Sequence, residues 1–132
     1  SFQNFSFNFD SAAGIIYTVD VTKPKGEKIT IISMADGTPF SMDKMYKVAL
    51  NSYRGNGGGE LLTKGSGISQ DELKDRILYS TDKDLRYYLM QYIEKKGVIE
   101  PHALGQWKFI PEEWVEPAAK RDYEYLFGKV EK

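Results

Sequence analysis

Strand-like and helix-like patterns occupy separate stretches of this sequence, and this order limits the architectures that the chain can adopt. Residues 5–9 alternate apolar and polar side chains, and segments 15–21, 28–34 and 45–50 are rich in β-branched and aromatic residues. Segments with helical periodicity begin only after a glycine-rich stretch that follows these four predicted strands. The order predicts an α+β domain with a strand-rich N-terminal half followed by helices.

Two sequence signals predict where helices lie. Ser69 and Glu72 have the spacing of a capping box, in which each residue satisfies a free N–H group at a helix N-terminus. A second helix is predicted by an apolar stripe at the spacing of one helical face, formed by Leu85, Tyr88, Leu89, Tyr92 and Ile93. Gly97 is expected to end that helix. A short strand at 106–110 and a terminal helix at 118–127 complete the prediction.

Composition narrows the classes of function. The 132 residues correspond to a single domain, 1–132, and 18 Lys and Arg residues nearly balance 19 Asp and Glu residues. We therefore expect neither a nucleic-acid polymer nor an anionic membrane as a partner held by bulk charge. No apolar run is long enough for a membrane span. Cysteine is absent and His102 is the single histidine, so thiolate zinc sites, cysteine nucleophiles and multi-histidine metal sites are excluded within this sequence.

The first residues contain no initiator methionine. They also lack the basic segment and the following apolar segment that make up a signal peptide. The expectation from this start is an excised fragment or a processed product of a longer protein.

A stretch rich in glycine follows the last predicted strand. Residues 51–67, read as a long loop, hold six of the twelve glycines. Tyr53 can stack on a purine or pyrimidine, Arg54 can form paired hydrogen bonds to a phosphate or carboxylate, and glycines allow the backbone to approach a ligand closely. The candidate substrate-binding residues are Tyr53, Arg54, Gly55, Asn56, Gly57 and Gly58. The alternative is a flexible surface loop, and neither a P-loop nor a dinucleotide fingerprint is matched.

Other polar and aromatic residues favour structural roles. His102 has no second histidine near it in the sequence and is interpreted as a surface residue. The acidic residues Asp71, Glu72 and Asp75 are interpreted as charges that complement a helix dipole. The helical spacing of Tyr87, Tyr88 and Tyr92 favours core and helix–sheet packing over a binding face.

Several of these segments resemble the C-terminal domain of the 5′-nucleotidase family. The segment Asn51-Ser52-Tyr53-Arg54-x-x-Gly57-Gly58 is its most specific part, and it is similar to the bacterial 2′,3′-cyclic-nucleotide 2′-phosphodiesterase/3′-nucleotidase branch. The remaining similar segments are 9–14, 19–24, 45–50, 84–86 and 107–111. The 5′-nucleotidase branch continues its glycine pair as Gly-Gly-Asp-Gly-aromatic, whereas this sequence continues as Gly59-Glu60.

The resemblance implies a division of labour. In the family, a separate metallophosphoesterase domain binds two divalent metal ions and hydrolyses the ester, while the C-terminal domain stacks the base between two aromatic side chains. By resemblance, Tyr53 is one of these aromatics, residues 54–58 line the pocket, and the second aromatic and the metal ions lie upstream of Ser1. This chain itself is expected to hold no catalytic residue, no metal and no cofactor.

The expected function is therefore substrate specificity in a phosphoric ester hydrolase, with a nucleotide or nucleoside as ligand and a metallophosphoesterase domain as partner, in cis or in trans. The chain alone is expected to be inactive. By resemblance, the parent protein is an exported bacterial enzyme that is periplasmic, cell-wall-bound or secreted. Two alternatives stay open: a stand-alone nucleotide-binding or interaction module, and a purely structural domain.

Overall fold

The computed structural model describes residues 9–128, which fold into two compact units. Among these residues, the first unit, here called the sheet unit, comprises residues 10–44 and 103–128. The second, the helical unit, comprises Phe9 and residues 45–102. Apart from Phe9, the predicted strand at 5–9 lies outside the described residues.

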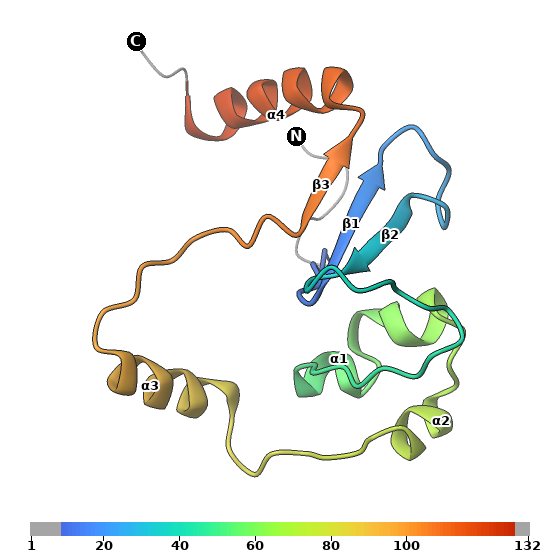
Figure 1. The fold of residues 1–132 in the computed structure, drawn as a ribbon, viewed down its shortest axis with the longest axis vertical. Coiled ribbons are helices and arrows are strands. Elements are labelled where there is room, and N and C mark those ends of the chain that lie inside the picture. The colour runs from blue at the N-terminus through green and yellow to red at the C-terminus, as the bar shows by residue number, and fades with distance from the viewer. Residues whose placement is uncertain (1–8, 129–132) are drawn as a thin grey trace. The chain divides into compact units, whose positions relative to one another are not determined.

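A three-stranded sheet forms the centre of the sheet unit, with β1 (Ile15–Asp20) between its two partners. Strand β2 (Ile29–Met34) pairs with β1 in the antiparallel direction, and the pairing register shifts between Ile16 and Tyr17. Strand β3 (Trp107–Ile110) pairs with the other edge of β1 in the parallel direction (Figure 1). The sheet thus joins segments from the beginning and the end of the chain, and all three strands agree with the sequence prediction.

Aromatic side chains hold this sheet together. Tyr17 is 5% exposed, and its hydroxyl accepts a hydrogen bond from the Ala12 backbone N–H at 3.1 Å. The rings of Tyr17 and Trp107 stack with centroids 5.9 Å apart, across the parallel pairing of β1 and β3. Phe109 meets Trp107 edge to face at 5.1 Å. These contacts supply the apolar burial and ring geometry that stabilise a small sheet.

Helix α4 (Glu112–Phe127) follows β3 directly. It begins before the predicted position 118 because Glu112 and Glu113 occupy its first turn, where carboxylates favour the positive end of the helix dipole. Pro117 lies inside the helix. A proline in a helix interior lacks the N–H of the regular hydrogen-bond ladder, and this hid the first turn from the sequence pattern.

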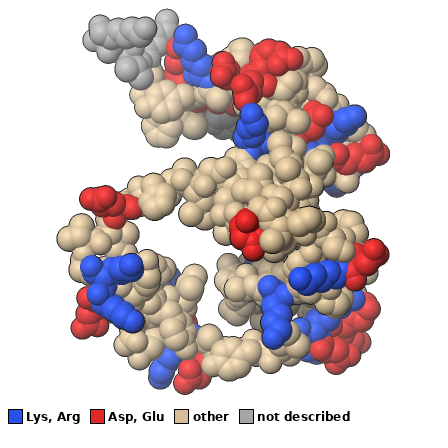
Figure 2. Space-filling view, viewed as in Figure 1, with Lys and Arg blue, Asp and Glu red and all other residues tan. Residues whose placement is uncertain are grey.

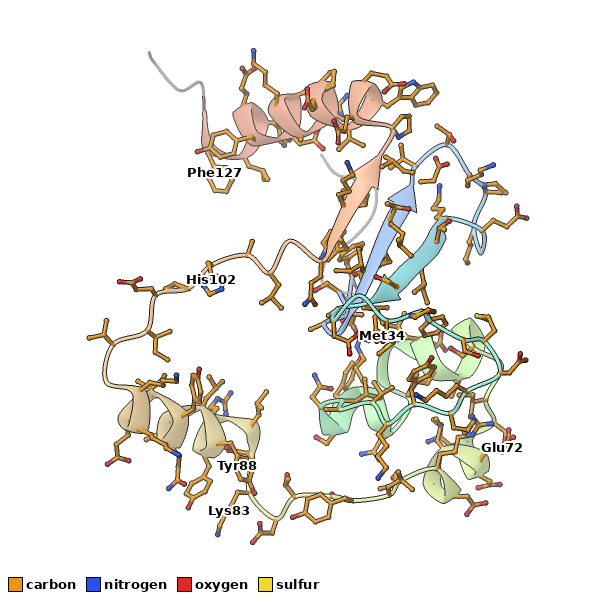
Figure 3. The ribbon with its side chains drawn as sticks, in the orientation of Figure 1. Met34, Glu72, Lys83, Tyr88, His102 and Phe127 are labelled. Carbon is orange, nitrogen blue, oxygen red and sulfur yellow. The ribbon has the colours of Figure 1, made fainter. Side chains whose placement is uncertain are left out.

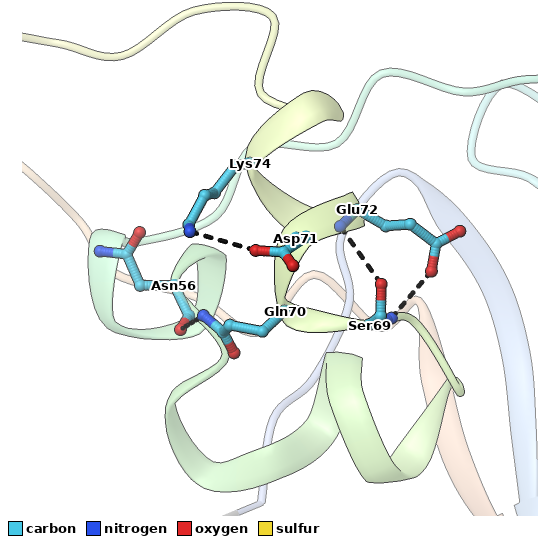
Figure 4. Close-up of polar contacts among 6 residues, drawn as sticks. All are labelled: Asn56, Ser69, Gln70, Asp71, Glu72 and Lys74. Carbon is cyan, nitrogen blue, oxygen red and sulfur yellow. Dashed lines mark hydrogen bonds and ion pairs between the residues drawn. The ribbon is translucent and has the colours of Figure 1, made fainter.

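The helical unit consists of short elements. They are α1 (Ser52–Gly55), the 3₁₀ turn η2 (Gly58–Glu60), the π turn η3 (Leu61–Gly65), α2 (Gln70–Asp75) and α3 (Leu85–Lys96). The capping box predicted for Ser69 and Glu72 is present at the start of α2 (Figure 4). Helix α3 begins after the N-cap Asp84, which the sequence pattern did not indicate, and its C-cap is Gly97, the residue predicted to end it. The α+β class is confirmed.

Two predictions in this unit are wrong. Residues 45–50 form no strand and pair with none of the three strands of the described sheet, which has the order β2-β1-β3. Met45 and Val48 accordingly remain exposed. Residues 51–67 are a series of helical turns and not a long loop, since Asn51 caps α1 and several glycines adopt positive φ.

The tyrosines of α3 do not form a core. Tyr87 and Tyr92 are 43% and 54% exposed, and α3 has no buried residue. Tyr88 is exposed as well (Figure 3). Within the helical unit the stripe has the right spacing, but no other described element of this unit packs closely against it. Helix–sheet packing stays a prediction, because the sheet belongs to the other unit.

Candidate functional site

The candidate site begins where α1 is capped. The Asn51 side-chain oxygen accepts a hydrogen bond from the Arg54 backbone N–H at 2.8 Å, and the Asn51 carbonyl accepts one from Gly55 at 2.9 Å. Asparagine is a preferred N-cap because its short side chain satisfies a free N–H group of the first turn. The cap starts a single helical turn at position 52, which places Tyr53 and Arg54 side by side.

Tyr53 presents its ring to the surface. Its side chain is 62% exposed, although the residue sits in a tightly folded segment. A Cβ atom placed on Gly58 would lie 2.6 Å from both Cδ2 and Cε2 of the ring, and 2.5 Å from the Tyr53 carbonyl oxygen. The backbone at Gly58 therefore lies directly against the ring, and only glycine fits there. The ring is held on one side and remains available for stacking.

Arg54 lies next to this contact and is 7% exposed. Its Nη1 donates a hydrogen bond to the Gly58 carbonyl at 3.0 Å. Its Cζ lies 5.3 Å from the centroid of the Tyr53 ring, which is within the range of a cation–π contact. The guanidinium thus links the ring of Tyr53 to the backbone of Gly58.

Two residues of helix α2 contact the backbone of the segment at Asn56 and Gly57. Gly57 has φ of 87°, and a Cβ atom there would lie 2.8 Å from Gln70 Oε1 and 3.4 Å from Leu73 Cδ1. Gln70 Nε2 donates a hydrogen bond to the Asn56 carbonyl at 2.9 Å (Figure 4). Leu73, at 5% exposure, is the buried apolar side chain of the described part of this unit. Both the close approach and the positive φ therefore require glycine at position 57.

The contacts of Gln70 and Leu73 with the glycine segment were not predicted from the sequence, although helical spacing marked Leu73 as an apolar-face residue. The hydrogen bond from Gln70 joins residues 14 positions apart, and no local pattern reveals such a pair. The capping box was the one available signal, because it fixes the start of α2 and hence the direction of its first turn.

Electrostatic features next to the site come from the start of α2. The backbone N–H of Ser69 donates to Glu72 Oε2 at 2.9 Å, and this bond, followed by the Ser69 side chain, lowers the pKa of Glu72 below its ordinary value. Hydrogen bonds to the ionised form favour it. Asp71 pairs with Lys74 at 3.3 Å, and Asp71 and Glu72 lie in the first turn of α2, as predicted. The prediction is wrong for Asp75, which is the last residue of α2 and so lies at the negative end of the helix dipole.

His102, the single histidine of the sequence, lies outside the segment 51–67. His102 follows α3, is exposed, and its Nδ1 lies 3.3 Å from the Glu100 carbonyl oxygen (Figure 3). Within residues 9–128, no group of three or more His, Asp or Glu side chains is arranged to hold a metal ion. Nor does this part of the chain contain a helix that is long and apolar enough to cross a membrane.

Charge is mixed over the visible surface. Lys, Arg, Asp and Glu side chains of both signs lie among each other, as Figure 2 shows. Such a surface lacks the single-sign field that attracts a polyanion over a distance. The candidate site is consequently defined by the exposed ring and the glycine backbone beneath it.

A segment of the chain that includes the candidate site matches a known protein family. The family model described as "5'-nucleotidase, C-terminal domain" matches residues 3–64, a range that includes all six predicted substrate-binding residues. The match confirms the resemblance noted in the sequence, and these residues belong to the 5′-nucleotidase C-terminal domain family.

Individual relatives agree with this assignment. The chain is 31% identical over 121 residues to the trifunctional nucleotide phosphoesterase protein YfkN of Bacillus subtilis, a match that covers 83% of this chain and 8% of the relative. It is 27% identical over 121 residues to the 2′,3′-cyclic-nucleotide 2′-phosphodiesterase/3′-nucleotidase of Haemophilus influenzae, covering 80% of this chain and 17% of the relative. The chain therefore spans less than a fifth of either relative. No solved structure matches it significantly.

Proposed function

We propose that this chain is the base-binding and specificity domain of a 2′,3′-cyclic-nucleotide 2′-phosphodiesterase/3′- or 5′-nucleotidase. The observation that carries the proposal is the Tyr53 ring, which is exposed yet held by the backbone of Gly58. An exposed ring with a fixed orientation is suited to stacking on a nucleobase, because little side-chain freedom is lost on binding. The names of the two relatives support a nucleotide as the ligand.

The mechanism assigned to this domain is positioning. The base is a part of the substrate that does not react, and binding energy gained there is used to hold the phosphoester in place for hydrolysis. By resemblance to the family, we assign hydrolysis, and the two divalent metal ions that the family uses for it, to a metallophosphoesterase domain, in cis or in trans.

The same proposal includes the longer protein to which this domain belongs. Residues 1–132 form one domain of the 5′-nucleotidase C-terminal type within a longer hydrolase, and the aromatic that completes the stack is supplied from upstream of Ser1. We assign the parent protein to the exported bacterial enzymes: the relatives support a bacterial enzyme, and export is assigned from the family resemblance alone.

A titration tests the proposal. Adenosine and adenosine monophosphate are added to the chain while tyrosine fluorescence and NMR shifts are followed, for the wild type, for Tyr53→Ala and for the matched control Tyr79→Ala. Tyr79 is an even more exposed tyrosine of the same unit, at 81%. We expect saturable binding that Tyr53→Ala weakens about tenfold or more, whereas Tyr79→Ala leaves it unchanged. Binding that survives Tyr53→Ala intact would contradict the proposal.

A further inference from the structure

Arg54 combines a charged side chain with near-complete burial. It is the one buried charged or polar residue among those that the structure describes, at 7% exposure. An arginine that serves as a ligand for a phosphate needs its fork of N–H groups directed toward the ligand. In this structure Nη1 is directed toward the Gly58 carbonyl, a group of the protein itself, at 3.0 Å.

Three contacts join Tyr53, Arg54 and Gly58 to one another. Arg54 holds the Gly58 carbonyl, the Gly58 backbone lies against Cδ2 and Cε2 of Tyr53, and the Arg54 guanidinium carbon lies 5.3 Å from the centroid of the same ring. Each member restrains the other two. The Tyr53 ring therefore has contacts with Gly58 and Arg54 that fix its plane, while 62% of the residue stays exposed.

We propose that Arg54 is a positioning residue that sets the plane of the Tyr53 ring. The site therefore recognises the planar base of its ligand and not the phosphate. The inference rests on the proposed function, in which Tyr53 stacks on that base. It differs from the role suggested by the sequence, where Arg54 was a direct partner for a phosphate or carboxylate.

The two roles predict different patterns of affinity. A positioning residue affects every ligand that stacks on Tyr53, so Arg54→Gln should weaken adenosine and adenosine 3′-monophosphate by the same factor, about tenfold. Arg54→Lys keeps the charge and a donor and should recover part of that loss. A phosphate ligand would give another result, in which Arg54→Gln weakens only the monophosphate. That result, or unchanged affinity for both ligands, overturns the proposal.

Arg86 provides the matched control. It lies on α3 in the same unit and is exposed. Arg86→Gln makes the same chemical change as Arg54→Gln and should leave both affinities within about twofold of the wild type. A loss of equal size in Arg86→Gln would show that net charge, and not the Tyr53 contact, causes the effect.

An NMR readout separates this proposal from the proposed function. The ring of Tyr53 should shift the Gly58 Hα resonances by its ring current, and this signature requires no ligand. We expect it to be lost in Arg54→Gln, weakened in Arg54→Lys and retained in Arg86→Gln, with amide shifts in β1 and β2 unchanged in all three. If the wild type binds neither ligand, the proposed function fails, and the ring-current signature alone decides the positioning role. Retention of the signature in Arg54→Gln overturns it.

Discussion

Position 58 has no room for a side chain, because the backbone there lies against the ring and the carbonyl oxygen of Tyr53. We predict that Gly58→Ala lowers the free energy of unfolding by about 1–3 kcal/mol, the usual effect of forcing extra atoms into a filled space. It should also displace the Tyr53 ring and weaken nucleoside binding. Urea denaturation and the titration with adenosine measure the two effects.

Gly65 provides the matched control in the same unit. It ends η3, its φ is not positive, and a Cβ atom there would lie 3.6 Å from the Glu60 carbonyl oxygen, an ordinary contact. Gly65→Ala should therefore leave adenosine binding unchanged and stabilise the chain by about 0.4–1 kcal/mol through reduced freedom of the unfolded state. If both alanine variants have the same effect, the close approach of Gly58 to Tyr53 is refuted.

The residues of the candidate site can be identified from the sequence, but their arrangement cannot. The aromatic, guanidinium and glycine residues at positions 53–58 stood out by composition alone. The inward direction of Arg54 depends on the path of the backbone through Gly57, and that path depends in turn on a contact with Gln70. Such contacts between distant positions are decided by tertiary packing, which single-sequence patterns do not contain.

Helix α2 should show a dependence on pH that comes from its capping box. The hydrogen bond from the Ser69 backbone N–H lowers the pKa of Glu72. A carboxyl group whose pKa is lower in the folded state stabilises the fold above its unfolded pKa, near 4.5, and loses that contribution as the pH falls through the lowered value. We predict that Glu72→Gln reduces stability at neutral pH and has a smaller effect at about pH 3.

Urea midpoints at the two pH values measure this effect. Glu100→Gln serves as the control, because it removes the same charge from an exposed residue outside the helices and strands. It should show a smaller change between the two pH values than Glu72→Gln. Equal pH dependence in the two variants would rule out the capping box as the cause.

Strand β3 depends on an aromatic contact for its place in the sheet. Trp107 stacks on Tyr17 across the parallel pairing, whereas Lys108, the next residue, makes an exposed ion pair with Glu112 at 2.6 Å. We predict that Trp107→Ala costs about 2 kcal/mol or more of stability, and that Lys108→Ala costs less than about 1 kcal/mol. Thermal or urea unfolding compares the two, and the reverse order would contradict this account of the sheet.

The elements that local signals specify were predicted well. Strands β1, β2 and β3 follow from β-branched and aromatic runs, α2 follows from its capping box, and α3 follows from its apolar stripe and Gly97. The segment 45–50 has the composition of a strand but not the structure, because a strand also requires a partner edge. The tyrosines of α3 show the same limit for helices, since periodicity reveals an apolar face but not what covers it.

The whole chain is expected to bind without catalysing. Its relatives carry phosphodiesterase and nucleotidase names, yet the chain spans 8% and 17% of their lengths. The division of labour proposed above assigns the ester cleavage to another domain.

We predict that the purified 132-residue chain does not hydrolyse 2′,3′-cyclic nucleotides or nucleotide monoesters, with or without added Mn²⁺. Phosphate release is measured for the wild type and for Tyr53→Ala, with a complete nucleotidase as the positive control. Turnover by the wild type that persists through repeated purification would contradict the prediction. Adding a metallophosphoesterase domain should restore hydrolysis, and Tyr53→Ala should then lower kcat/KM, because the base contact positions the ester for the reaction.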